Sequence, residues 1–231
     1  MAIIESIKIK DIDMSKCYFN AGCAINVYKP QIAQKMFLLL KEHFGPVKHH
    51  NICCHHNPNL PQGSTIINNC AGCDRRFRTL YEGINTITFW EVLDTLSTVK
   101  LPDWSGLSVS VHDSCSFRQK PQVHNAVRNI LKKMNIKIIE SDFCREKSVC
   151  CGDTFYGVIP NTKVIETQKR RAAQMPCDKV LVYCIGCLRA LYEGGKQTLY
   201  LPDLIFGAIS TPIKDDLQLH HRLIEKYRAE H

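Results

Sequence analysis

The sequence has no long apolar run of the kind that crosses a membrane. Its longest apolar stretch, Val180 to Tyr192, is interrupted by Arg189 and falls short of the roughly 18 residues that a spanning helix needs. Residues 1–14 mix Glu, Lys and Asp among apolar residues, so they contain no signal-peptide core. We therefore expect a cytoplasmic protein without a membrane span, whose cysteines stay in a reducing compartment.

Two common nucleotide-binding motifs are also missing. The sequence contains neither a G-x-G-x-x-G dinucleotide fingerprint nor a Walker loop, so electrons for any redox reaction would have to come from a separate partner. The net charge is +8, but the basic residues are scattered and form no stripe with interleaved aromatics. This pattern argues against nucleic acid as a partner.

Cysteine, in contrast, is abundant. The 231 residues are 45% apolar and 23% charged, which is ordinary for a folded chain of one large domain or two small ones. Thirteen residues are cysteine, too few for a small secreted disulfide scaffold but many for a protein of a reducing compartment. Clustered thiols in such a compartment indicate metal binding, iron–sulfur clusters or redox chemistry rather than structural disulfides.

Hydrophobic periodicity predicts strands that alternate with helices. Apolar residues recur at helical spacing in some segments, and short apolar or alternating runs mark strands in others. Helices are predicted at 30–44, 122–134 and 161–175, the last capped by Asn161, with a charged helical tail at 214–231; strands are predicted at 107–111, 136–139 and 179–183. This alternation is typical of an α/β fold with mainly parallel strands.

The chain contains an internal repeat. CAGCDRRFRTLYEG (70–83) and CIGCLRALYEG (184–194) share C-x-G-C and a later Leu-Tyr-Glu-Gly. Each copy follows a Cys-Cys pair, and each pair follows a lone cysteine, in FNAGC and in HDSC. The repeat predicts two tandem related lobes, each a small mainly parallel sheet with flanking helices and with cysteines on loops at the carboxyl ends of strands. We place the first, shortened lobe at 1–98 and the second, with the helical tail, at 99–231.

In the second copy, five cysteines on three loops are expected to converge. Five thiolates repel one another strongly unless a cation neutralises them. A tetrahedral zinc ion is full at four ligands and leaves one cysteine over, whereas a multinuclear iron–sulfur centre accommodates all five. The run C-x-x-C-x-x-C is absent, which argues against an ordinary ferredoxin-type cubane. Structural zinc in one or both lobes is the alternative.

This spacing resembles the CCG (cysteine-rich) domain family, whose signature is Cys, a spacer, Cys-Cys-Gly, a second spacer and C-x-x-C. The signature occurs in duplicate in the cysteine-rich subunit of heterodisulfide reductases and in relatives from lactate and glycolate oxidation complexes. The resemblance covers about residues 18–207 and implies that each motif holds a noncubane [4Fe-4S] cluster through its five cysteines. Carried over by position, the second set is Cys115, Cys150, Cys151, Cys184 and Cys187, and the first set is Cys23, Cys53, Cys54, Cys70 and Cys73.

The first copy departs from the family pattern. His55 stands where the family has glycine, and only fifteen residues separate Cys54 from Cys70. We expect a smaller and more open first lobe, whose cluster can differ in type or ligation. Four histidines around this pair are either solvated loop residues or a ligand, proton donor or substrate contact: His49, His50, His55 and His56.

Other residues near the motifs carry weaker signals. His112 and Asp113 can orient a ligand or hydrogen-bond to cluster sulfur, and Asp113 can equally cap a helix. Three arginines are either surface residues or partners for a substrate carboxylate or phosphate: Arg75, Arg118 and Arg189. Three cysteines outside both motifs are expected to be small buried residues: Cys17, Cys144 and Cys177.

Together these observations favour an oxidoreductase. The resemblance implies reduction of a disulfide or related sulfur substrate at two facing clusters between the lobes, with electrons from a ferredoxin-like or flavin-containing partner. A small anionic sulfur compound would suit the arginines near the clusters. Two alternatives are a non-catalytic electron-transfer subunit of a lactate- or glycolate-oxidising complex and a zinc-stapled binding module.

Overall fold

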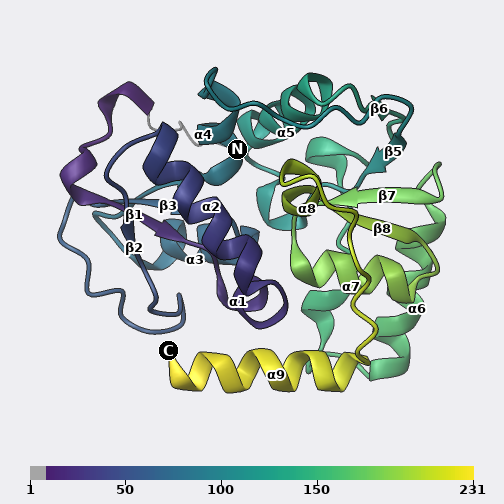
Figure 1. Ribbon diagram of the computed structural model, residues 1–231. Helices are drawn as coiled ribbons and strands as arrows, with labels where there is room; N and C mark the ends of the chain where they lie inside the picture. Colours follow the sequence, from purple (N-terminus) through teal and green to yellow (C-terminus); the bar gives the residue numbers. More distant parts are fainter. Residues whose placement is uncertain (1–8) are drawn as a thin grey trace.

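The computed structural model describes residues 9–231, so most of the N-terminal segment considered above lies outside the described residues. Within this range the chain forms two sheets of four parallel strands each, flanked by helices (Figure 1). The first sheet contains β1 (Cys17–Asn20), β2 (Lys48–His49), β3 (Thr65–Asn68) and β4 (Asn85–Thr88); the second contains β5 (Ser108–Val111), β6 (Lys137–Ile138), β7 (Lys179–Val182) and β8 (Gln197–Tyr200). The predicted fold class, α/β in two related lobes, is confirmed.

The two sheets have the same topology. Their strand orders are β2-β1-β3-β4 and β6-β5-β7-β8, and every neighbouring pair is parallel. In each lobe the first strand therefore lies at the centre, beside the strand that leads into C-x-x-C. Because the carboxyl ends of parallel strands meet at one edge of a sheet, the two cysteine-bearing turns of each lobe are neighbours.

Helices connect these strands in a similar order in both lobes. The first lobe contains α1 (Cys23–Tyr28), α2 (Pro30–His43), α3 (Ala71–Leu80) and α4 (Phe89–Thr95); the second contains α5 (Pro121–Lys133), α6 (Asn161–Ala173), α7 (Ile185–Glu193) and α8 (Leu201–Ile205), and α9 (Leu217–Glu230) follows. Between β2 and β3, residues 50–64 stand where the second lobe has α6, and they contain no helix. The first lobe is thus the shorter one, as its sequence predicts.

The predicted elements are present, with corrections at their ends. Asn161 does not cap α6: it is the first helical residue, Pro160 precedes it, and no side-chain cap is formed. The charged tail becomes helical only at Leu217, where Asp216 accepts a hydrogen bond from the Leu219 N–H (2.8 Å). The short strands β1, β2, β3, β4 and β8 were not predicted, because two to four residues with polar members give little hydrophobic pattern.

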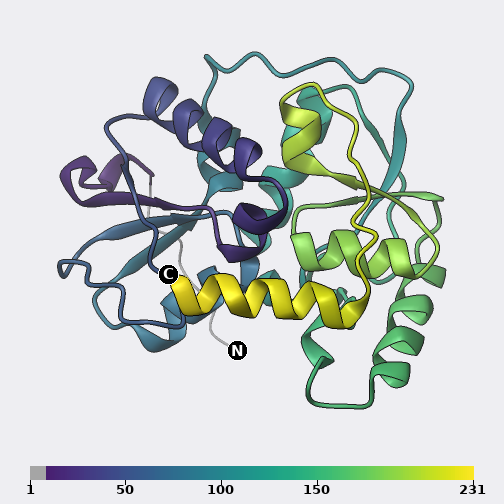
Figure 2. The same ribbon diagram turned by 60° about the horizontal axis from the view of Figure 1, so that its bottom comes forward.

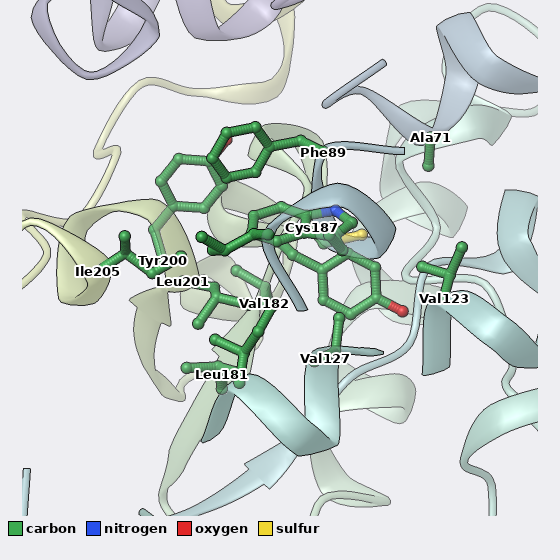
Figure 3. Close-up of a cluster of buried hydrophobic side chains, with 14 of the residues drawn as sticks. Ala71, Phe89, Val123, Val127, Leu181, Val182, Cys187, Tyr200, Leu201 and Ile205 are labelled. Carbon is green, nitrogen blue, oxygen red and sulfur yellow. The ribbon is translucent and has the colours of Figure 1, made fainter. Parts of the chain in front are cut away.

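A continuous apolar core joins the two lobes. Trp90 of α4 is fully buried and packs edge-on against Tyr183, which follows β7, with ring centroids 5.8 Å apart. In Figure 3, Phe89 and Ala71 of the first lobe lie in the same buried cluster as Val127 and Leu181 of the second. This packing fixes how the carboxyl edges of the two sheets face each other.

The C-terminal helix α9 extends across both lobes (Figures 1 and 2). Asn26 of α1 donates a hydrogen bond to the Tyr227 hydroxyl (2.9 Å), and the Cys53 N–H donates to the His231 carbonyl (3.0 Å). The tail that we assigned to the second lobe therefore packs against the first as well. None of the helices within residues 9–231 has the length and apolar character needed to cross a bilayer.

Candidate metal–sulfur centres

The motif cysteines lie at the carboxyl edges of the two sheets. Cys23 opens α1 just after β1, and Cys115 follows β5. Cys70 and Cys184 occupy the N-cap positions of α3 and α7. A helix N-terminus favours negative charge, so this position suits a thiolate ligand.

In the second lobe the five motif thiols lie next to one another in a row. Cys150 lies beside Cys115 and Cys151. The Sγ atoms of Cys151 and Cys187 lie 3.4 Å apart, and Cys184 lies on the other side of Cys187. Three separate loops thus deliver their sulfur atoms to one place.

The first lobe repeats this arrangement in the same order. Its row of thiols runs Cys23, Cys53, Cys54, Cys73, Cys70. The shortened loop is held by α3, because Arg76 Nε (3.1 Å) and the Tyr81 hydroxyl (3.0 Å) both donate to the Cys54 carbonyl. The short spacer and His55 therefore do not prevent the five sulfur atoms from gathering.

Neighbouring thiols in each row shift one another's pKa. The adjacent Cys53 and Cys73 thiols lower the pKa of Cys54 to about 5, while the adjacent Cys54 and Cys70 raise the pKa of Cys73. In the second lobe, the adjacent Cys115 and Cys151 thiols hold the pKa of Cys150 far below its ordinary value. Neutral thiols thus stabilise a neighbouring thiolate, and complete deprotonation of either set requires a cation.

The backbone conformation at position 152 and its close packing against α6 require a glycine there. Its φ of +100° lies in the left-handed region, and a Cβ there would come within 3.2 Å of the Thr167 and Gln168 side chains. The first lobe has no helix at this place, and His55 does not have a positive φ. The family glycine is therefore replaceable in the lobe that lacks α6.

Both cysteine sets border one cavity of about 290 Å³ between the lobes. The thiols that line it are Cys23, Cys54, Cys70 and Cys73 from the first set and Cys115, Cys151, Cys184 and Cys187 from the second. Its charged and titratable walls comprise His55, Arg75 and Arg76 from the first lobe, Asp153 from the second, and His220, His221 and Arg228 from α9. The sequence predicted this facing of the two sets but not the contribution of α9.

Arg75 is the one of the three arginines proposed from sequence that lines this cavity. Arg118 instead donates to the Ser148 carbonyl, and Arg189 is 1% exposed, with its guanidinium 3.7 Å from Asp153. Arg228, which no motif indicated, lies beside Cys23. It comes from a tail with no cysteine motif, so only the three-dimensional packing reveals its position.

Asp113 anchors the turn that carries Cys115 through several hydrogen bonds. It accepts hydrogen bonds from the Arg128 guanidinium, from the Tyr183 hydroxyl (2.9 Å) and from the Arg145 backbone N–H (2.7 Å). Ser114, not Asp113, precedes the helical turn at Cys115, so the predicted helix cap is wrong. Asp113 therefore ties the β5 turn to α5 and to the loop before Cys150.

His112 lies against the second set of sulfur atoms. It is 1% exposed, and one of its ring nitrogens is within 4.8 Å of the Sγ atoms of Cys151 and Cys187. Arg171 of α6 donates from Nε to His112 Nδ1 (3.1 Å). Burial and the nearby Arg171 charge lower the pKa of His112 to about 3, so its ring is neutral at physiological pH.

Of the four histidines near the first pair, His55 lines the cavity. His50 is buried and packs edge-on against Phe77, and His56 contacts the Arg228 carbonyl at 2.8 Å. His49 packs edge-on against Phe37. The interpretation of these histidines as solvated loop residues is therefore wrong for His50.

The cysteines outside both motifs differ from one another. Cys17 is fully buried, and burial raises its pKa to about 11. Cys144 and Cys177 are only half-buried, so the expectation of burial holds for Cys17 alone.

Comparisons with known proteins support the second motif. Residues 109–192 match the family model of the cysteine-rich domain, CCG, a range that runs from β5 to α7 and includes all five cysteines of the second set. No curated protein matches the sequence. Among solved structures, the chain is similar to Picrophilus torridus aspartate racemase, with 10% identity over 91% of this chain and 93% of that one. The TM-score is 0.33. Residues 109–192 are thus similar to a cysteine-rich domain, and their clustered thiols indicate an iron–sulfur or other metal site.

Proposed function

We propose that this protein is an iron–sulfur oxidoreductase similar to the cysteine-rich subunit of heterodisulfide reductases, and that it reduces a disulfide or related sulfur substrate between its lobes. Each five-cysteine set would hold one [4Fe-4S] cluster, of the noncubane type. The observation that carries the proposal is the single cavity that both sets line. A substrate in this cavity would contact both centres at once.

The donor set fits such a cluster. Each centre offers five neighbouring thiols, and four ligands already complete a tetrahedral zinc site. A zinc ion in either lobe would leave one buried thiol without a role. The motif cysteines of each set, named above, are the ligands that we propose.

Disulfide reduction consumes two electrons and two protons, breaks the S–S bond and releases two thiols. The bound clusters would supply the electrons one at a time. The chain itself would hold the substrate and supply protons, for which His55 and His221 are suitably placed in the cavity wall.

We further propose that the substrate is anionic. Arg75, Arg76 and Arg228 line the cavity, and Asp153 is the one carboxylate among the described residues that line it. A guanidinium binds a carboxylate or phosphate through charge-assisted hydrogen bonds. Electrons would come from a separate ferredoxin-like or flavin-containing protein, because the sequence has no nucleotide-binding motif.

The proposal is tested on protein purified without oxygen. We expect about eight irons per chain with matching inorganic sulfide, from two four-iron clusters, and consumption of an anionic disulfide by the chemically reduced protein. Cys151→Ser should abolish this turnover, whereas Cys177→Ser, outside both motifs, should retain it. Bound iron without turnover of any disulfide would leave the chain an electron carrier and refute the enzymatic proposal. Zinc in place of iron would refute both the enzymatic proposal and a role as an electron carrier.

A further inference from the structure

His112 can act at the second centre in two chemically exclusive ways. One ring nitrogen lies within 4.8 Å of the Sγ atoms of Cys151 and Cys187, and by distance alone these three residues could bind one metal ion. A histidine that binds a metal uses a bare ring nitrogen and donates the N–H of the other nitrogen to an acceptor. The partner of the second nitrogen therefore distinguishes a ligand from a hydrogen-bond donor.

That partner is Arg171, which can only donate. Its Nε lies 3.1 Å from His112 Nδ1, and a guanidinium has no acceptor atom. Nδ1 must then carry a bare lone pair, so the single proton of the neutral ring is on Nε2. A protonated Nε2 cannot bind a metal, but it can donate a hydrogen bond.

Arg171 is itself held firmly in place. It is 1% exposed, and its other nitrogens donate to the Gln174 side chain (3.0 Å) and to the Phe143 carbonyl (2.9 Å). These contacts fix the orientation of its Nε–H toward His112. Arg171 is therefore a positioning residue that selects the tautomer of His112.

The Nε2–H of His112 needs an acceptor. Within residues 9–231, Nε2 is buried and has no hydrogen-bond partner. The Sγ atoms of Cys151 and Cys187 lie within 4.8 Å of one ring nitrogen, so a metal–sulfur group held by these two cysteines would bring sulfur atoms close to the ring. A buried donor without an acceptor is costly, and a sulfur of a negatively charged metal centre is a good acceptor.

We propose that Arg171 locks His112 as an Nε2–H donor to a sulfur atom of the second centre, and that this hydrogen bond raises the reduction potential of that centre. The effect on potential rests on the proposed function, because it requires a redox-active metal–sulfur group. A hydrogen bond to sulfur stabilises the more negative, reduced state, so its removal lowers the potential.

The first centre has no counterpart of the Arg171–His112 pair among the described residues. Asn20 ends β1 as His112 follows β5, three residues before the lone cysteine in each case. The Asn20 amide donates to Asn68 (2.9 Å) and accepts from the Gly22 N–H (3.1 Å). The sequence position is shared, but the side chain is engaged with its own strand neighbours rather than with a buried arginine.

The test compares three variants by EPR-monitored redox titration of protein purified without oxygen. His112→Leu should shift the redox equilibrium of the second centre about tenfold toward the oxidised form, which is about 59 mV for one electron. His112→Gln places an amide N–H near the position of Nε2 and should keep most of the wild-type potential. His124→Leu is the control, because His124 is equally buried but neighbours Asp113 and Glu146 instead of the sulfur atoms. An unchanged potential in His112→Leu, with its iron content intact, overturns the proposal.

A second measurement needs no variant. In protein labelled with ¹⁵N-histidine, pulsed EPR should give the weak nitrogen coupling of a hydrogen bond to sulfur, and the strong coupling of a metal-bound nitrogen would overturn the proposal. If the protein contains no iron, the proposed function fails, and NMR of the same sample still reads the tautomer. A proton on Nε2 then supports the Arg171 lock, whereas a proton on Nδ1 refutes it.

Discussion

The two lobes gather the same five sulfur atoms but surround them differently. Both rows of thiols run in the same order, from the lone cysteine through the pair to the second and then the first cysteine of C-x-x-C. Only the second lobe has α6, which imposes Gly152 and supplies Arg171. The first lobe has a short loop with His55, held from α3 by Arg76. The strand ends and the C-x-x-C turn are therefore enough to bring the sulfur atoms together. In the second lobe, α6 adds further constraints through Gly152 and Arg171.

The C-terminal helix α9, in contrast, contributes residues to both centres. It contributes Arg228 beside Cys23 of the first centre and His221 beside Asp153 of the second, with His221 Nε2 3.5 Å from the carboxylate. His221 also stacks on Tyr156, with ring centroids 3.9 Å apart. One helix thus reaches both sets, so its removal should perturb the cavity from both sides.

The largest expected effect comes from removing a ligand from one lobe at a time. Cys151→Ser and Cys54→Ser should each lose about half of the bound iron and all disulfide turnover, because each centre would hold its own cluster and the proposed reaction needs both. Metal analysis and activity of the two variants check this. Retention of full turnover by either variant would show that the lobes are not equivalent partners in the reaction.

The glycine difference between the lobes gives the next largest effect. Gly152→Ala should destabilise the protein by about 3 kcal/mol, because it combines a strained positive φ with a contact against α6. His55→Ala at the corresponding place should cost only about 0.5 kcal/mol. Denaturant unfolding measures both changes, and similar losses in the two variants would contradict the role assigned to α6.

The basic wall of the cavity should affect substrate binding. Arg228→Gln removes a guanidinium from the cavity and should raise the KM for an anionic disulfide about tenfold, the usual cost of one charge-assisted hydrogen bond. Arg118→Gln is the matched control, because Arg118 donates to the Ser148 carbonyl and does not line the cavity. Equal KM values for the two variants would remove Arg228 from the proposed binding site.

The last prediction concerns the acid stability of the first lobe. Burial lowers the pKa of His50 from 6.5 to about 4 in the folded protein. The unfolded chain binds this proton more readily, so stability that is fully present above pH 6.5 is lost as the pH falls toward 4, by roughly 2 kcal/mol. His50→Phe, which can pack against Phe77, should flatten this part of the stability profile. An unaltered pH dependence of unfolding would mean that other groups control it.

The cysteine motifs could be read locally. The lone cysteines and the C-x-x-C turns follow strands or begin helices, so the gathering of the motif cysteines between the lobes could be anticipated, whereas their role as ligands stays a prediction. The first-lobe strands and β8 were missed because they are short and contain polar residues, which leaves little hydrophobic pattern.

The remaining features depend on long-range packing. The contact of Arg171 with His112 joins residues 59 positions apart, and no local pattern relates an arginine on α6 to the end of β5. Arg228 reaches Cys23 because α9 folds back across the molecule. Such contacts follow from how whole elements pack, which short motifs do not specify.

The central claim is that two metal–sulfur centres face one cavity. An anaerobic crystal structure with anomalous data at the iron edge tests it most directly. We predict two separate iron peaks, one within each set of five cysteines, on opposite sides of the cavity. Iron in one lobe only, or no iron in protein that is colourless when prepared without oxygen, would contradict the account.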